Sequence, residues 1–476
     1  MMKKILATLI ACFILVGLVV IFYWRDIQYQ PESADLINYF LILPVVISLL
    51  LLSPWLIYKT YQHYKEKKQR VLQAEQEQEH RSTELSLPVL ESKWLELNLY
   101  AAGAYSALGE NDSILDGIKK FSSPQLDQNL VNFHGIPILS YRIEELDQQI
   151  QNTDDEDLQF LSVRQQRIMT LIHHQIEQHT ELLASIADHL KRSSLFYESQ
   201  NLHEYRMHPA WIDPSFSGDE EREALQVEVE QIYRLDKLNL HILLSEDVVH
   251  TWNDQSSNES IQAIFYDLGM IPQKFHIEYH YLSAASTEQY LLELLDRIQN
   301  QAHEVSLVIA ADSEIDQEII DEKSWGAGAY IPSEFVSSSC LAHPAVQLER
   351  LQPEKTFKLV SNQNNLDQIF QELKLDDLPQ YQAEEPFVLV VEDGTDVKVA
   401  KKLEQFFKQS PVEAHHYLYC KPIFGHSQNV AKLFGIMLGA HFSESHVAFV
   451  YGHNLKAFIQ AVPEITQDQE SVAIAD

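Results

Sequence analysis

Cysteine is scarce in this sequence, which has three cysteines among its 476 residues. Cys12 falls within an apolar N-terminal run, Cys340 and Cys420 stand far apart, and no Cys-x-x-Cys pair occurs. This spacing excludes a disulfide framework and a thiolate zinc site. So few cysteines fit a protein of a reducing compartment.

Several well-known motifs are missing as well. No Gly-x-Ser-x-Gly, P-loop or Gly-x-Gly-x-x-Gly occurs, so serine hydrolase, NTPase and dinucleotide-binding functions have no support. His174 and His179 lie five positions apart in a helical run, and that spacing does not place two metal ligands on one helix face. We expect an ordinary solvated helix surface there.

Positive charge is in short supply. The chain has 35 Lys and Arg against 69 Asp and Glu, a formal net charge of −34. Nucleic-acid binding needs basic side chains for the phosphates, so this balance argues against it. Broad docking on anionic lipid is disfavoured too, apart from the basic stretch 59–70, which we interpret as a topology signal.

Long uncharged runs are present near the N-terminus, at 5–24 and 36–58. The first alone would form about 30 Å of helix, enough to cross a bilayer. A cleaved signal peptide is the alternative, but no A-x-A-like site follows Trp24 and a second span comes soon after. We predict a transmembrane hairpin over 1–58. Basic residues outside both spans place the two ends in the cytoplasm of a bacterium and the short loop in the periplasm.

The remaining chain is large enough for two or more packed units. Residues 59–84 are polar and lack Gly and Pro, which indicates a cytoplasmic stalk helix. From residue 238 onwards strands alternate with helices, which predicts an α/β fold with a largely parallel sheet and a weak internal duplication. We divide this part into an N-terminal half, 85–350, with a helical insertion at 143–190, a C-terminal half, 351–465, and a tail, 466–476. The predicted strands are 94–101, 238–244, 275–282, 305–311, 357–361, 387–391, 416–420 and 447–451, and the predicted helices outside the insertion are 113–121, 261–268, 288–300, 366–374, 397–408 and 430–440.

Four segments, taken in order, resemble the β-ketoacyl synthase branch of the thiolase superfamily. They are the small-residue turn in 97–109, the strand-to-helix turn Tyr279–Ser286, the sequence Glu392-Asp393-Gly394-Thr395, and Lys421 followed by Gly425-His426-Ser427. The resemblance covers about 89–462. It implies a thiolase-like, duplicated mixed-sheet domain that forms a homodimer.

The resemblance also implies a site, and this sequence departs from it. The family's nucleophile position falls near Ala284, and the position of its first histidine is taken by Asp393, whereas Lys421 and His426 are retained. A condensing enzyme needs a thiolate at a helix N-terminus and donors for the developing oxyanion. Ala284 cannot be acylated and an anionic Asp393 would repel an oxyanion, so we predict a degenerate site without catalytic residues.

Two alternatives accompany this prediction. Lys421 and His426 could be catalytic together with Cys420, although a cysteine that ends a buried strand is usually inert. The simpler interpretation pairs Lys421 with Asp393 and makes His426 a helix cap. Elsewhere, His276, Glu278 and His280 alternate along one strand; a polar strand face is favoured there over a zinc site.

The expected function is therefore that of a non-catalytic adapter or scaffold on the cytoplasmic side of the inner membrane, with protein partners and no cofactor or metal. The overall layout also resembles the lipase-adapter family of type VI secretion systems, which implies a lipase effector and a secretion spike protein as partners. The alternative is a membrane-associated acyltransferase or condensing enzyme. A plain membrane scaffold is a third hypothesis.

Overall fold

The computed structural model describes residues 15–16, 18–23, 25–26, 43, 93–152, 161–204, 232–323, 330–361, 363, 365–375, 378, 380, 389–391, 397–426, 429–441, 446–452 and 455–462. The chain falls into two compact units, Met1–Leu90 and Glu91–Asp476. The predicted spans 5–24 and 36–58 lie largely outside the described residues, and the predicted stalk 59–84 lies wholly outside them. Among the residues that are described, no helix has both the length and the apolar character needed to cross a membrane.

The second unit is built on one large mixed sheet that contains the same five-stranded pattern twice. In each half, the first strand pairs antiparallel with the fifth, the fifth antiparallel with the fourth, the fourth parallel with the second, and the second parallel with the third. The first half comprises β1 (Lys93–Ser106), β5 (Lys237–Ser245), β6 (Phe275–Leu282), β7 (Glu304–Ser313) and β8 (Glu334–Ala342). The second comprises β9 (Lys355–Ser361), β10 (Leu389–Val391), β11 (Leu418–Tyr419), β12 (Ala448–Tyr451) and β13 (Leu455–Ala461). The predicted duplication is thus confirmed by strand order and direction.

The antiparallel pair β1–β9 joins the two halves. Antiparallel pairing therefore fills the centre of the sheet, and the prediction of a largely parallel sheet is wrong there. Two central strands, β8 and β13, escaped prediction because their sequences do not read as apolar runs. β8 carries three consecutive serines, yet all nine of its residues are buried.

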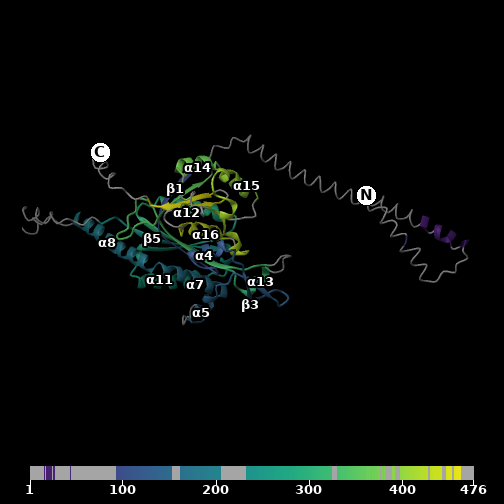
Figure 1. Cartoon of the computed structure of the whole chain (residues 1–476). Helices are drawn as coiled ribbons and strands as arrows, with labels where there is room; N and C mark the ends of the chain where they lie inside the picture. The colour runs from purple at the N-terminus through teal and green to yellow at the C-terminus, as the bar shows by residue number, and fades with distance from the viewer. Residues whose placement is uncertain are drawn as a thin grey trace, which may run out of the picture. The chain divides into compact units, whose positions relative to one another are not determined.

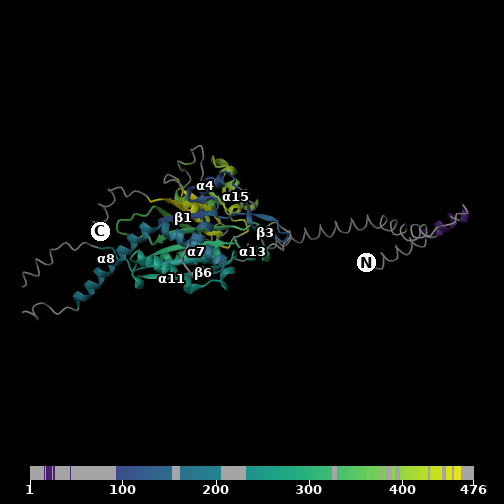
Figure 2. The ribbon, with the colours of Figure 1, turned by 90° about the horizontal axis from the view of Figure 1, so that it is seen from below.

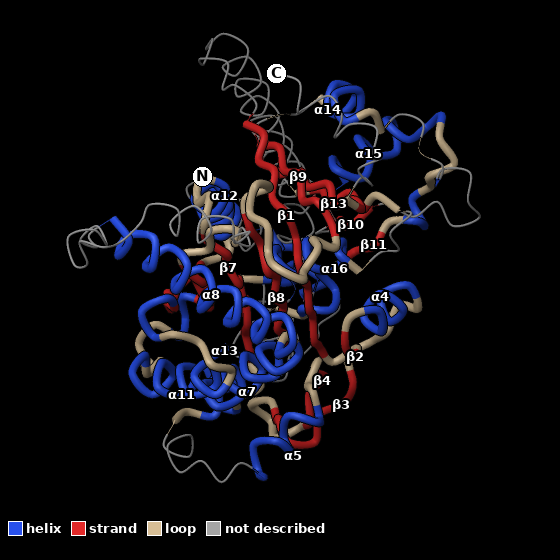
Figure 3. The backbone as a smooth tube through the Cα atoms, turned by 90° about the vertical axis from the view of Figure 1, so that its left-hand side faces the viewer, coloured by secondary structure: helices blue, strands red, loops and turns tan. Residues whose placement is uncertain are grey.

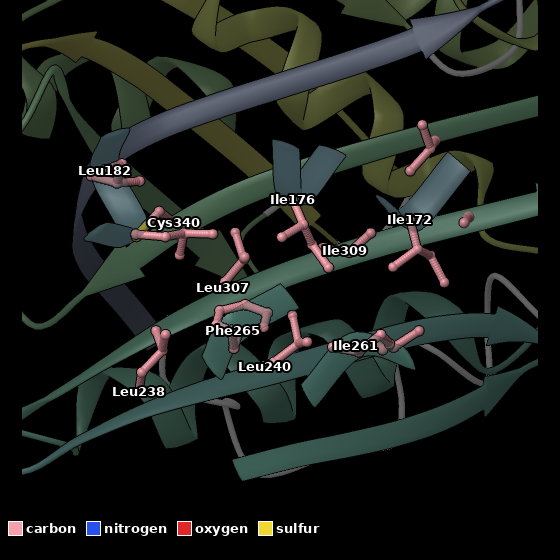
Figure 4. Packing of buried hydrophobic residues seen from close by; sticks show 14 of the residues in the cluster. Ile172, Ile176, Leu182, Leu238, Leu240, Ile261, Phe265, Leu307, Ile309 and Cys340 are labelled. Carbon is pink, nitrogen blue, oxygen red and sulfur yellow. The ribbon is translucent and has the colours of Figure 1, made fainter. Parts of the chain in front are cut away.

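The sheet is covered on both sides, so successive side chains of one strand enter different cores. Leu238, Leu240 and Ile242 of β5 pack with α7 (Val163–Gln178), α8 (Thr180–Glu204) and α11 (Asp254–Asp267), whereas Leu243 enters another cluster. Figure 4 shows the first of these cores, in which Ile172 and Ile176 of α7 and Phe265 of α11 pack with Leu240 and Ile309 of the strands.

Two helices occupy equivalent places in the two repeats, each following the third strand of its half. They are α12 (Thr287–Gln299) after β6 and α16 (Ala431–Ala440) after β11. One hydrophobic cluster collects side chains from these helices and from strands of both halves, so α12 and α16 lie between the halves. A third cluster packs α14 (Leu366–Leu373) and α15 (Val397–Phe406) on the second half. Figure 1 labels all four helices, and Figure 2 shows α15 from below, on the other side of β1 from α7 and α11.

The long insertion between β1 and β5 contains more than the predicted helical region. After β2 (Gly109–Glu110) and α4 (Asp112–Lys119) comes a separate hairpin of β3 (Gln125–Val131) and β4 (Pro137–Ser140), which Figure 3 shows beside α5 (Glu144–Asn152). Within the described residues, the helical insertion predicted over 143–190 comprises α5, α7 and α8. Ser162 caps α7 by accepting a hydrogen bond from the Gln165 N–H, and the chain turns again at His179.

Candidate functional site

The turn between β6 and α12 holds the position that the sequence resemblance assigns to a nucleophile. Ala284 is exposed in this turn, and its backbone N–H donates to Asn429 Oδ1 at 3.1 Å. The Asn429 amide donates in turn to Ser245 Oγ, at the end of β5, at 2.6 Å. Thr287 Oγ1 closes the arrangement by donating to the backbone carbonyl of Asn429. Asn429 therefore holds the N-terminal turn of α12 against the segment that leads into α16.

The hydroxyls beside Ala284 are engaged with the turn itself. Ser283 Oγ and Ser286 Oγ lie 3.0 Å apart, and Ser286 Oγ accepts from the Ser283 N–H at 3.1 Å. No histidine hydrogen bond to either hydroxyl is found among the described residues, so neither serine has the neighbouring base that nucleophilic attack requires.

His426 lies in the equivalent turn of the second repeat, before α16. It is exposed, its Nδ1 accepts from the Ile331 N–H at 3.0 Å, and its ring stacks on Tyr330 with 4.9 Å between centroids. Gly425 makes this arrangement possible: its φ is +48°, and a Cβ there would stand 2.2 Å from the Ile331 carbonyl oxygen. The structure thus fixes His426 against the 330–331 segment and not as a helix cap.

The remaining two predicted site positions, Lys421 and Asp393, are not fully described by the structure. The backbone of Lys421 begins the short 3-10 turn Lys421–Phe424, but its side chain is not described. Asp393 lies outside the described residues, so its proposed pairing with Lys421 stays a prediction.

Neither described thiol takes the place of the missing nucleophile. Cys340 is fully buried in β8 among residues packed on α7 and α8, as Figure 4 shows. Burial raises the pKa of its thiol to about 12, so the thiolate is not populated at neutral pH. Cys420 is buried in the core between the two halves with Leu418 and Phe424.

A charged network that the sequence analysis missed connects α7 to the ends of β7 and β8. Arg164 Nη2 donates to Asp312 Oδ1 at 2.9 Å, and Arg167 Nη2 donates to Glu334 Oε1 at 2.6 Å. All four side chains are buried. Their sequence signal was two arginines three positions apart in a helix, but the acidic partners lie 148 and 167 residues further on. Buried ion pairs of this kind fix the position of α7 against the two strands. Removing one partner would leave the other charge buried and unpaired, and would lower the folding stability by several kcal/mol.

The network continues to the His426 segment through Glu314. Burial and the neighbouring Asp312 raise the pKa of Glu314. Its carboxylate accepts from Lys323 Nζ at 2.6 Å and from the hydroxyl of Tyr330, the residue on which His426 stacks. The carboxylates of Asp312, Glu314 and Glu334 therefore each have a cationic or hydroxyl partner. None of the three is left free to act as a general base.

No family model matches this chain, and none of the curated proteins does. Among solved structures it is similar to the ketosynthase from module 6 of the Bacillus subtilis bacillaene synthase, at 10% identity and a TM-score of 0.42, covering 78% of this chain and 71% of that one. It is also similar to an oxazolomycin ketosynthase domain from Streptomyces albus, at 8% identity and a TM-score of 0.41, covering 78% and 76% of the two chains. A type III pentaketide synthase from Neurospora crassa matches at 8% identity and a TM-score of 0.34, covering 77% of this chain and all of that one. These matches are to ketosynthases and a polyketide synthase, and at 8–10% identity they concern the fold alone.

Proposed function

We propose that this chain is a non-catalytic scaffold that binds protein partners, held at the cytoplasmic face of the inner membrane by the N-terminal hairpin. The carrying observation is the state of the β6–α12 turn. Its exposed position is a methyl group, and its backbone N–H, the natural oxyanion donor of such a turn, is bonded to Asn429. The Ala284 side chain cannot be acylated, and the backbone N–H beside it already has a hydrogen-bond partner. Both features favour a binding function over a catalytic one.

The β3–β4 hairpin offers a surface suited to a protein partner. Its cross-strand partners Leu126 and Leu139 are 56% and 44% exposed. Phe133 and Ile136 at its tip are exposed as well, and so is the neighbouring Phe121. Apolar side chains gathered on the surface of an acidic protein are typical of interaction sites.

The surroundings of the hairpin indicate what kind of partner fits. A hollow of about 580 Å³ lies beside it, lined by Phe121, Pro124 and Tyr141 from the insertion and by Tyr417 from the second half. A second hollow, of about 730 Å³, includes the acidic side chains of Glu144 and Glu145. An apolar segment flanked by Lys or Arg would match both the apolar hairpin and the acidic neighbourhood.

The test is affinity purification of the full-length chain from its native membrane, followed by mass spectrometry. We expect a protein partner that is lost, at least about tenfold, when Leu126 and Leu139 are both changed to Ser, because their contacts would be removed. The matched control is Leu195→Ser, since Leu195 is 69% exposed on α8, away from the hairpin. A lipase effector or spike protein among the captured partners would extend the proposal to secretion.

Capture that is unchanged in the double variant would remove the hairpin as the docking surface. The competing function, an acyltransferase or condensing enzyme, predicts a covalent acyl adduct after incubation with acyl-CoA. We expect the intact mass of the chain to stay unchanged. An adduct on Ser283, Ser286 or Cys420 would overturn the non-catalytic proposal.

A further inference from the structure

Three metal-ligand side chains meet on the face of the sheet that α12 covers. His241 of β5 and Glu278 of β6 are register partners in the parallel pair, and His280 follows Glu278 by two residues, on the same face of β6. Both histidines are buried, and the carboxylate is partly exposed. The sequence grouped Glu278 and His280 with His276 as a polar strand face. It gave no sign of His241, which is distant along the chain and joins them only through the pairing of β5 with β6.

The three ligand atoms converge on one point. His241 Nδ1 lies 3.2 Å from His280 Nε2 and 3.3 Å from Glu278 Oε2, and His280 Nε2 lies 3.7 Å from the same carboxylate oxygen. Tetrahedral zinc binds nitrogen and oxygen at ~2.0–2.1 Å, which separates its ligand atoms by ~3.4 Å. The observed distances bracket that value, so the side chains could hold the ion with only small movements.

The surrounding groups orient two of these ligands, His280 and Glu278. The Tyr290 hydroxyl is hydrogen-bonded to His280 Nδ1, the ring nitrogen that faces away from the cluster. Arg297 Nη1 donates to both oxygens of Glu278, at 3.1 and 3.2 Å, so Glu278 Oε1 can keep its arginine while Oε2 turns to an ion. Outer partners of this kind fix the orientation of metal ligands and are expected at built sites.

We propose that His241, Glu278 and His280 form a Zn²⁺ site. Two imidazoles and one carboxylate suit zinc among the common cations. No fourth His, Cys, Asp or Glu completes the group within the described part of the chain. A water molecule or ligand atom would fill the fourth position, the arrangement found at open rather than closed zinc sites. The site lies apart from the β3–β4 hairpin and does not depend on the scaffold function.

The test uses the full-length chain in detergent, stripped with a chelator and titrated with Co²⁺, whose visible absorption reports tetrahedral coordination. We expect one Co²⁺ per chain, displaced by Zn²⁺. Glu278→Gln removes the carboxylate at a partly exposed position and should weaken Co²⁺ binding at least about tenfold. His280→Ala should abolish the band. The matched control is His276→Gln, an exposed histidine on the same face of β6 that is outside the cluster.

A second measurement separates lost binding from lost folding. Zinc should raise the thermal midpoint of the wild-type chain and of His276→Gln, but not that of Glu278→Gln, since binding to the folded state alone stabilises it. A wild-type chain without the tetrahedral band would overturn the site. So would a Glu278→Gln variant that, by circular dichroism, is folded and binds Co²⁺ as tightly as wild type.

Discussion

At the scale of single residues, His179 links the helices of the insertion to the serine-rich centre of β8. Its Nε2 lies 2.7 Å from Ser338 Oγ, and the same hydroxyl donates to Gln175 Oε1 at 2.6 Å. The side chain is buried, so the expected solvated helix surface is wrong at this position. Burial, and to a smaller extent His441, lowers the pKa of His179 to about 4. The folded chain thus keeps this imidazole neutral in a pH range where the unfolded chain would protonate it.

That difference predicts how stability depends on pH. Because the folded pKa is below the unfolded value of ~6.5, the contribution of His179 is fully present above pH ~6.5 and is lost as pH falls towards 4. Denaturant titrations give the free energy of unfolding at pH 7 and at pH 4.5. Between these two pH values it should fall by ~2–3 kcal/mol less for His179→Gln than for wild type. The control His303→Gln, at an exposed position, should behave like wild type. An equal loss in all three chains would contradict the prediction.

At the scale of elements, the N-terminus of α12 is the feature on which the proposed non-catalytic function depends. The helix has thirteen residues, and Ala284, in the turn before it, is exposed. A thiol introduced at position 284 would lie near the positive end of the helix dipole, which lowers a thiol pKa. The two cysteines of this unit are both buried.

Ala284→Cys therefore tests whether the turn still has the electrostatics of a nucleophile site. We expect iodoacetamide to modify Cys at 284 at least about tenfold faster than any thiol of the wild-type chain under native conditions. Mass spectrometry of the peptides would locate the label. Ala285→Cys, at the neighbouring exposed position, is the matched comparison. If the two variants react alike, the turn has no special effect on position 284.

The same elements show what could be predicted from the sequence. The strands β5, β6 and β7 and the helix α12 were predicted nearly to their ends, because apolar strands and an amphipathic helix carry a local pattern. β8 was missed because its buried serines have no such pattern. Asn429, which binds the backbone of Ala284, and Ser245, which binds Asn429, come from remote segments. The same is true of His241 in the metal cluster. Contacts of this kind depend on the sheet order and register, which a single sequence does not reveal.

At the scale of the whole molecule, one strand connects the two repeats. β1 pairs with β9 over its first half, from Lys93 to Leu99, and with β8 over its second half, to Ser106. Both halves also share the core around α12 and α16. Because the halves share both this strand and one of their hydrophobic cores, we infer that they unfold together as a cooperative unit.

The proposed attachment of the chain to a membrane rests on the uncharged runs 5–24 and 36–58, and it can be tested as a topology. With both ends of the predicted hairpin in the cytoplasm, the loop at 25–35 faces the periplasm and residues 59–84 do not. Ser33→Cys should then react with a membrane-impermeant maleimide in intact cells. Ser82→Cys, the matched control beyond the second span, should react only after lysis. Labelling of Ser82→Cys in intact cells would place the folded unit on the opposite side of the membrane and would remove the cytoplasmic scaffold proposal with it.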